Sequence, residues 1–215
     1  MGFTLKAYLA SGLLFLIPGH FLSAGTNDQN SPEITIFVYN TARVSLPDLS
    51  LAEQQASLIF RQTGIVTAWV NCSAASLKGP CRPAGPSQFI LHIVAHGKTS
   101  TDAVFGVAFL GTDGRGRYCD VFYDRIEKMQ IDSGANAGRL LGTVAAHEIG
   151  HLLLGSQSHS AMGVMSARWR EEELRRVSMG SLRFTSEQAS RMRARIDDWQ
   201  RGGDNVRVAR TGSSE

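Results

Sequence analysis

The sequence predicts an α/β (α+β) fold in which a mixed, twisted β-sheet lies behind one long helix. Short runs of β-branched and aromatic residues, bounded by turn residues, recur between residues 34 and 126 and indicate strands. A later stretch, residues 140–154, is apolar around nearly its whole circumference, which is typical of a buried helix. Strands that precede one buried helix favour a sheet with that helix packed on its face.

The predicted fold begins with a strand, a helix and a second strand. Ile34–Tyr39 is β-branched and aromatic, and it is expected to be a buried strand. A helix is expected over Leu51–Gln62, because Ser50 and Glu53 match a capping box at its head. Ile65–Val70 is expected to be the second strand.

Three further strands and a connector lead to the long helix. The strands are expected at Phe89–Ala95, Val104–Leu110 and Cys119–Ile126, where apolar and β-branched residues dominate. Ser133–Gly138 is rich in glycine and small residues, and it is expected to be an irregular connector. The long helix should end at Gly155, since glycine readily adopts the left-handed conformation that follows a helix.

The part of the chain after the long helix is expected to be mainly helical. Glu171–Arg176 is highly charged, which is typical of a solvated helix face. Thr185 and Gln188 match a capping box for a last helix that ends near Trp199. Residues 202–215 are polar and are expected to form a flexible tail.

The length and charge of the chain limit the classes of protein that it can represent. Its 215 residues are enough for one domain with a substantial core, expected at residues 32–201. The formal net charge of +3 is small, and the arginines are scattered along the chain. We therefore expect no nucleic-acid partner, and we expect a monomer.

The N-terminus has the composition of a secretory signal peptide. A lysine precedes the apolar run Ala7–Ile17, and small residues follow it, so residues 1–24 are predicted to be removed. A run of about eleven apolar residues is too short to span a bilayer, so no stable membrane anchor is expected. The sequence therefore predicts a secreted or periplasmic protein.

The three cysteines fit an oxidising compartment. Cys72 and Cys81 flank a short loop that contains glycine and proline, and they are predicted to form a disulfide. Cys119 lies in an apolar, strand-like segment, and it is expected to be a buried free thiol.

The long helix contains the motif His-Glu-x-x-His at residues 147–151. Residues four apart project from the same face of an α-helix, so His147 and His151 can bind one metal ion. Zinc suits this pair, because it binds neutral imidazole nitrogen and leaves a coordination position open for water. Glu148 lies beside that face, where it can take a proton from water that the metal has made more acidic. The motif therefore predicts metal-assisted hydrolysis with Glu148 as general base.

The apolar surroundings of the motif favour a metal over two ordinary core histidines. Two imidazoles and a carboxylate are costly to bury in an apolar helix unless another group compensates them. A bound ion is the simplest compensation. The alternative is a pair of histidines that hydrogen-bond to the backbone beside a salt-bridged glutamate.

The residues after the motif resemble the metzincin clan of zinc peptidases. That family combines the His-Glu-x-x-His helix with a glycine that turns the chain, a third histidine, and a methionine in a tight turn under the metal. Here Gly155, His159 and Met165 fill those places, and Gly163-Val164-Met165 is similar to the family's Met-turn. The family's glycine and third histidine follow the second histidine by three and six residues. In this sequence they follow it by four and eight.

The resemblance implies a zincin-like architecture for the whole domain. The sheet and the long helix would form an upper subdomain at residues 32–155, above a small, mainly helical lower subdomain at residues 156–201. Val104–Leu110 would be the edge strand that pairs with an extended substrate, a general way to hold a peptide. Residues 166–169, which include Trp169, would wall the pocket for the substrate residue after the scissile bond.

The sequence contains two candidates for the third metal ligand. The resemblance implies His159, with Met165 as the turn methionine in preference to Met162. A different class of zinc peptidase takes a glutamate from a following helix, and the acidic run at residues 171–173 is the candidate for that role.

These observations together predict a secreted zinc-dependent metalloendopeptidase. Zn²⁺ would be held by His147, His151 and His159, and a peptide or protein would be the substrate. The alternative is a secreted protein that keeps zinc for structure and acts as an inactive binding module.

Overall fold

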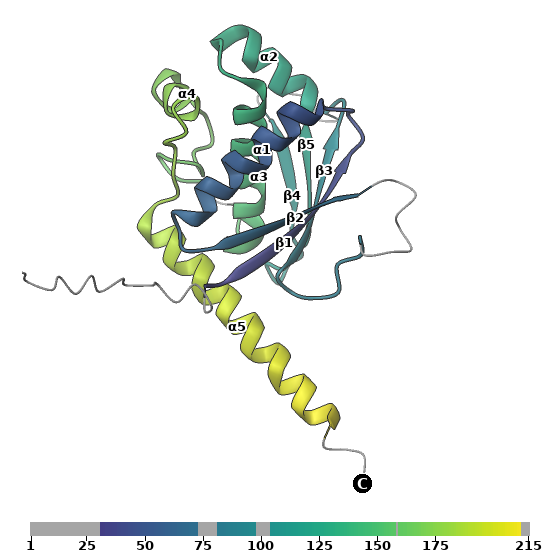
Figure 1. Cartoon of the computed structure of the whole chain (residues 1–215). Coiled ribbons are helices and arrows are strands. Elements are labelled where there is room, and N and C mark those ends of the chain that lie inside the picture. The colour runs from purple at the N-terminus through teal and green to yellow at the C-terminus, as the bar shows by residue number, and fades with distance from the viewer. Residues whose placement is uncertain (1–30, 73–80, 98–103, 158, 212–215) are drawn as a thin grey trace, which may run out of the picture. The chain divides into compact units, whose positions relative to one another are not determined.

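The computed structural model describes residues 31–72, 81–97, 104–157 and 159–211, with side chains up to residue 201 (Figure 1). The predicted signal peptide, residues 1–24, lies outside this range. None of the described helices is long and apolar enough to cross a membrane. The elements, in chain order, are β1 (Glu33–Asn40), α1 (Leu46–Arg61), β2 (Val66–Cys72), β3 (Gln88–Val94), β4 (Gly106–Phe109), β5 (Tyr118–Phe122), α2 (Tyr123–Ser133), α3 (Ala137–Leu154), α4 (Glu171–Ser178) and α5 (Ser186–Thr211).

The strands form one five-stranded sheet in the order β2-β1-β3-β5-β4. Three of its pairings are parallel, whereas β4 runs antiparallel to β5, so the sheet is mixed, as predicted. The expected strand Val104–Leu110 is shorter in the structure, Gly106–Phe109. It lies at the edge of the sheet, with β5 as its one neighbour.

Helices α1 and α3 cover the same face of the sheet (Figure 1). Alternate residues of the central strands point into this layer because side chains alternate between the two faces of a strand. The buried side chains include Ile36 of β1, Leu91 of β3 and Val121 of β5, together with most of α3. The long apolar helix is therefore the centre of the core, which confirms the prediction of a mixed sheet backed by one long helix.

Two glycines let α3 pack very closely on α1. A Cβ atom at Gly142 would lie 2.3 Å from the carbonyl oxygen of Ala52, and one at Gly138 would lie 2.8 Å from that of Asp48. Only a residue without a side chain fits at these points. The close approach fixes the position of α3 beside α1 on this face of the sheet.

The first helix begins earlier than the sequence predicted. Ser45, not Ser50, is the N-cap of α1, and its hydroxyl oxygen accepts a hydrogen bond from the Asp48 N–H. Pro47 lies in the first turn, where its missing N–H costs nothing and its fixed φ favours a helix. The proline therefore starts the helix, whereas we had expected the helix to begin after it.

The expected strand Cys119–Ile126 is wrong in its second half. The strand ends at Phe122, and the helix α2 follows at once and runs to Ser133. Ile126 is fully buried on this helix, so an apolar residue expected on a strand belongs to an amphipathic helix instead. The connector to α3 is correspondingly shorter, and it begins at Gly134 with a left-handed φ of 70°.

The last helix also extends beyond its expected end near Trp199. The structure carries α5 to Thr211, into the segment that was expected to be a polar tail. Residues 156–201 otherwise contain α4 and most of α5, in line with a mainly helical C-terminal part.

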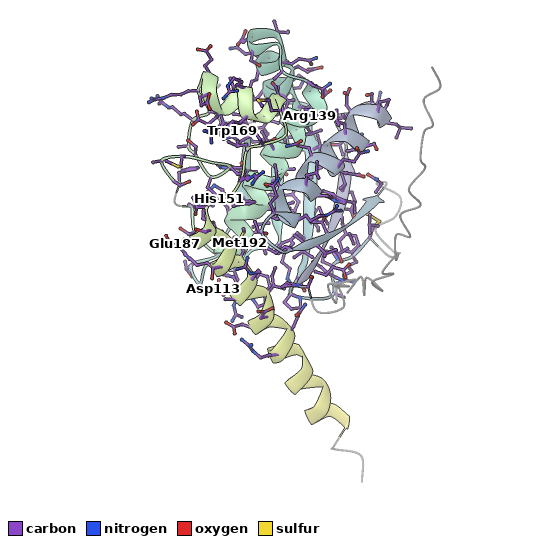
Figure 2. All side chains as sticks on the ribbon, turned by 60° about the vertical axis from the view of Figure 1, so that its left-hand side comes forward. Asp113, Arg139, His151, Trp169, Glu187 and Met192 are labelled. Atoms are coloured by element: carbon purple, nitrogen blue, oxygen red, sulfur yellow. A yellow bond between two sulfur atoms is a disulfide. The ribbon has the colours of Figure 1, made fainter. Side chains whose placement is uncertain are left out.

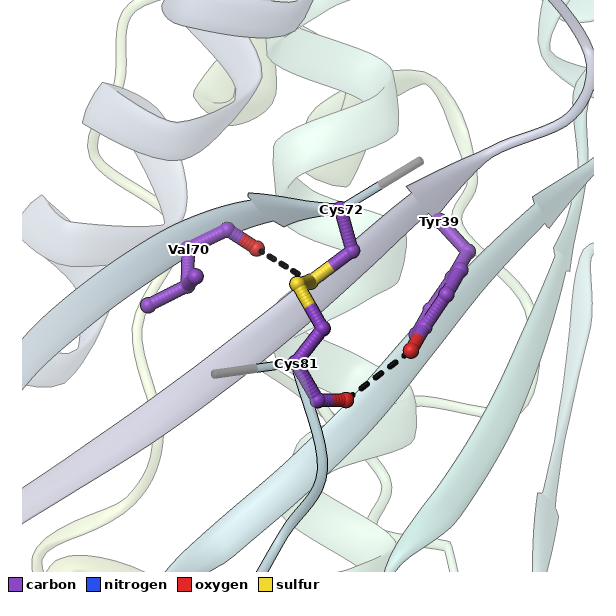
Figure 3. Close-up of a disulfide and its surroundings, with 4 residues drawn as sticks. All are labelled: Tyr39, Val70, Cys72 and Cys81. Atoms are coloured by element: carbon purple, nitrogen blue, oxygen red, sulfur yellow. Dashed lines mark hydrogen bonds between the residues drawn. A yellow bond between two sulfur atoms is a disulfide. The ribbon is translucent and has the colours of Figure 1, made fainter. Parts of the chain in front are cut away.

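The disulfide and the free thiol agree with the sequence analysis. Cys72 and Cys81 are bonded, with Cα atoms 5.9 Å apart, and the Tyr39 hydroxyl donates to the Cys81 carbonyl oxygen at 2.9 Å (Figure 3). The disulfide therefore fastens the segment after residue 80 to the end of β2. Cys119 is buried and free.

Candidate metal centre

Helix α3 presents His147 and His151 on one buried face. Asn136 caps its N-terminus by accepting a hydrogen bond from the Arg139 N–H, and Gly155 ends it with a left-handed φ of 65°. His147 is 9% exposed and His151 only 2%. The helix is therefore regular through the motif, and both imidazoles lie inside the protein.

Each imidazole is oriented by a backbone carbonyl from the chain after the helix. Nδ1 of His147 lies 2.7 Å from the Val164 oxygen, and Nδ1 of His151 lies 2.7 Å from the Ser156 oxygen. A carbonyl oxygen can only accept, so Nδ1 must carry the proton in both rings. The lone pair of each neutral imidazole is therefore on Nε2, the atom that faces the site.

The two Nε2 atoms face each other at 3.1 Å. Two nitrogen lone pairs at this distance repel each other unless both point to the same cation. Two nitrogens bound to one tetrahedral zinc at about 2.05 Å are about 3.3 Å apart. The spacing and the tautomers therefore fit a shared zinc ion.

His159 completes a group of three imidazoles. Its ring centre lies 5.3 Å from that of His147 and 5.0 Å from that of His151. The three ligand atoms lie within 4.8 Å of one another, and His159 is the exposed member of the group. The structure thus brings the three predicted residues together despite the longer spacing between His151 and His159.

The acidic run at residues 171–173, the alternative source of a third ligand, has other contacts. The side chain of Glu173 accepts a hydrogen bond from the Arg170 N–H at the start of α4. Glu172 pairs with Arg175 and Arg176, whose hydrogen bonds lower the pKa of its carboxyl to about 2. Within the described ranges, only the three histidines form a group that could hold a metal ion.

Burial favours the neutral form of the His147 and His151 imidazoles. Burial lowers the pKa of His147 to about 4, although the hydrogen bond to Val164 acts in the opposite direction. Burial also lowers the pKa of His151. Neutral imidazole is the form that binds a metal ion.

The side chain of Glu148 extends from α3 toward the edge strand β4. Its side chain is 5% exposed, and burial raises the pKa of its carboxyl to about 8. A Cβ atom at Gly106 would lie 2.7 Å from Cγ and 2.8 Å from Oε1 of Glu148. The carboxyl group therefore packs directly against the backbone of β4, and a cation beside it would favour its ionised form.

Met165 lies in a tight turn packed against α3. Gly163 has a φ of 81°, and its carbonyl oxygen accepts a hydrogen bond from the Ser166 N–H at 3.1 Å. Met165 is fully buried, and its Sδ would lie 2.7 Å from a Cβ atom at Gly150. The turn thus contacts the helix one residue before His151. Met162, the rival methionine, is 64% exposed.

A cleft of about 440 Å³ opens over the three histidines. Its lining comes from the chain that leads into β4 and from the segment that follows Met165. Figure 2 labels His151 of α3 and Trp169 of the second segment. Trp169 packs against the core, and its indole N–H lies 3.4 Å from the Val164 oxygen. The lining consists of Val104, Phe105, Gly106, Val107, Met129, Val144, His147, Glu148, His151, Gln157, His159, Ser166, Ala167, Arg168 and Trp169.

Two residues of the cleft had no clear signal in the sequence. Met129 reaches it from α2, a helix that the sequence analysis did not predict. Gln157 lies outside the motif, between the end of α3 and His159, and its Nε2 donates to the Ala108 carbonyl oxygen at 2.7 Å.

Two other histidines, His92 and His96, do not belong to the site. His92 contacts the hydroxyl groups of Thr41 and Tyr118 at 2.9 and 2.8 Å. His96 is 3.6 Å from Asp124. His92 is thus a hydrogen-bonding residue, and neither imidazole belongs to the group of three histidines.

Comparisons with known proteins show similarity of fold. No family model and no curated protein matches the sequence. A zinc-dependent peptidase from Methanocorpusculum labreanum aligns over 73% of this chain and 99% of its own, with 15% identity and a TM-score of 0.51. The archaemetzincin of Methanopyrus kandleri covers 78% of this chain and 98% of its own, with 14% identity and a TM-score of 0.50.

A third solved structure is metalloproteinase-II from Bacteroides fragilis. It covers 78% of this chain and 54% of its own, with 12% identity and a TM-score of 0.50. At such low identity these alignments show that the chain shares its fold with zinc-dependent peptidases.

Proposed function

We propose that this protein is a secreted, zinc-dependent metalloendopeptidase of metzincin-like build. The observation that carries the proposal is the pair of buried imidazoles whose unprotonated Nε2 atoms face each other at 3.1 Å, beside a buried glutamate. The shared fold with zinc-dependent peptidases supports it. The N-terminal segment and the disulfide support secretion.

His147, His151 and His159 would hold the zinc ion, and Met165 would support the site through its contact with α3. When bound, zinc would lower the pKa of a coordinated water to about 7 and polarise a peptide carbonyl. Glu148 accepts the proton of the attacking water and then donates it to the leaving amine. The edge of β4 and the wall at residues 166–169 bind the peptide between them.

The buried position of Glu148 suits it for this role. Its carboxyl group lines the cleft, and contact with Gly106 restricts its movement. A base held in one place loses little freedom when the reaction occurs. A zinc site with a purely structural role has no need of a carboxylate in this position.

The test compares variants of the secreted protein for metal content and peptide hydrolysis. Glu148→Ala is expected to bind zinc and to lose about 100-fold to 10,000-fold in kcat. His147→Ala is expected to lose both zinc and activity. Glu127→Ala, which removes an exposed carboxylate on α2, is the matched control and should behave like the parent protein.

The measurements are zinc content by mass spectrometry and cleavage of a peptide library with and without a chelator. Retained turnover in Glu148→Ala would contradict the mechanism. If the protein binds zinc but cleaves nothing in a chelator-sensitive manner, it is instead an inactive or structural zinc protein that acts as a binding module.

A further inference from the structure

The outer side of β4 offers the backbone groups of Gly106 and Ala108. In an antiparallel pair, alternate residues bond to the neighbouring strand, and those between them point away from it. The Phe122 N–H donates to the Phe105 carbonyl oxygen at 2.9 Å, so Phe105 and Val107 face β5. The N–H and C=O groups of Gly106 and Ala108 therefore point to the free edge, where a peptide can pair.

One of these groups already has a partner within the protein. Nε2 of Gln157 donates to the Ala108 carbonyl oxygen at 2.7 Å. Gln157 lies between the end of α3 and His159, and its side chain lines the cleft. Its amide thus occupies the place where the backbone N–H of a bound peptide would donate.

We propose that Gln157 determines specificity by closing one end of the substrate edge of β4. The proposal rests on the proposed peptidase function. Gly106 lies against Glu148 and marks the place of the reaction, and Ala108 is two residues further along the strand. At about 3.4 Å per residue, this leaves about 7 Å before the closed end. Peptide residues beyond about the second on that side of the scissile bond therefore add no binding energy through this edge.

A longer peptide gains nothing by displacing the glutamine. It would exchange one hydrogen bond to the Ala108 carbonyl for another of the same kind, and the displaced amide would return to water. Pairing in the opposite direction is not limited in this way, because none of the hydrogen bonds among the described residues uses the outward N–H or C=O group of Gly106.

The experiment uses two series of peptides around one cleaved bond, one extended at the N-terminus and one at the C-terminus by one to five residues. With the parent enzyme, kcat/KM should stop rising after about two residues in one of the two series. Gln157→Ala frees one backbone acceptor, so the KM of the longer peptides in that series should fall about twofold to tenfold, with kcat unchanged. N-methylation of the peptide amide that reaches Ala108 should abolish this gain.

Gln54→Ala is the matched control, since Gln54 is an exposed glutamine on α1 whose amide donates to Ser50. The ratio of KM values for a long and a short peptide does not depend on how much of a preparation is active. The comparison therefore remains valid if Gln157→Ala is less stable. Zinc content is measured on every variant.

Two results would overturn the inference. An equal change in KM for all peptides, or a fall in kcat and zinc content for all of them, would mean that Gln157 only holds the loop before His159. If the parent enzyme cleaves neither series, the proposed function fails. The same peptides are then tested for binding to the zinc-loaded proteins, and equal length dependence with and without Gln157 would refute the closed edge.

Discussion

For the proposed peptidase, replacement of Gly106 by alanine should lower the activity about 100-fold without loss of zinc binding. The glycine is not in the left-handed region, so alanine can adopt its backbone conformation and the effect is steric. The added methyl group would lie 2.7 Å from Cγ of Glu148 and 2.7 Å from the Asp120 carbonyl oxygen. The backbone oxygen lies within the sheet, so the glutamate side chain is the neighbour that can move.

The size of the effect follows from these distances. Carbon atoms pack at about 3.5–4.0 Å, so the carboxyl group must shift by about 1 Å. Misplacement of a catalytic group by 1 Å can cost about 100-fold in rate. Crowding in the core should also lower the free energy of unfolding by about 1–3 kcal/mol.

The assay is kcat/KM on a single peptide, together with zinc content and urea-induced unfolding. We expect Gly106→Ala to lose about 100-fold in kcat/KM while zinc content stays at one ion per chain. Gly85→Ala is the control, because its Cβ would meet its nearest neighbour, in the Gln88 side chain, at an ordinary 3.7 Å. Full activity of Gly106→Ala would refute the argument that this strand positions Glu148.

Three further changes test the scaffold. Replacing Cys72 and Cys81 by serine should cost about 2–3 kcal/mol of unfolding free energy, since the disulfide joins residues separated by nine positions; urea unfolding measures it. Met165→Ala should cost about 2–5 kcal/mol, because it leaves a cavity at a fully buried position, whereas Met165→Leu should cost less than about 1.5 kcal/mol and keep its zinc. Arg195→Met removes the hydrogen bond from the guanidinium to the Gly114 carbonyl oxygen and should cost about 1–3 kcal/mol in thermal unfolding. If the double serine variant, Met165→Ala or Arg195→Met unfolds with the same free energy as the parent protein, the corresponding estimate is wrong.

The parts of the fold that the sequence predicted are those with a strong local pattern. The apolar circumference of α3 and the four-residue spacing of His147 and His151 depend only on helix geometry, and both are observed. Glycine at the end of α3 is a local signal of the same kind. Such features need no knowledge of distant residues.

The parts that the sequence did not predict depend on contacts between distant segments. Ile126 looked like part of a strand, because a single buried residue of an amphipathic helix cannot be distinguished from one in a strand. The contact of Gly106 with Glu148 joins two elements far apart in the chain, and so does that of Gln157 with Ala108. No periodicity within one segment encodes them.

Both buried imidazoles take their orientation from carbonyl oxygens that come later in the chain, at Ser156 and Val164. The orientation of both imidazoles is thus encoded outside the helix that carries the motif. If zinc binds as proposed, its binding is coupled to the order of these two backbone carbonyls. Removal of the proposed zinc ion should then speed amide hydrogen exchange in the turn at Gly163–Ser166 more than in the strands of the sheet.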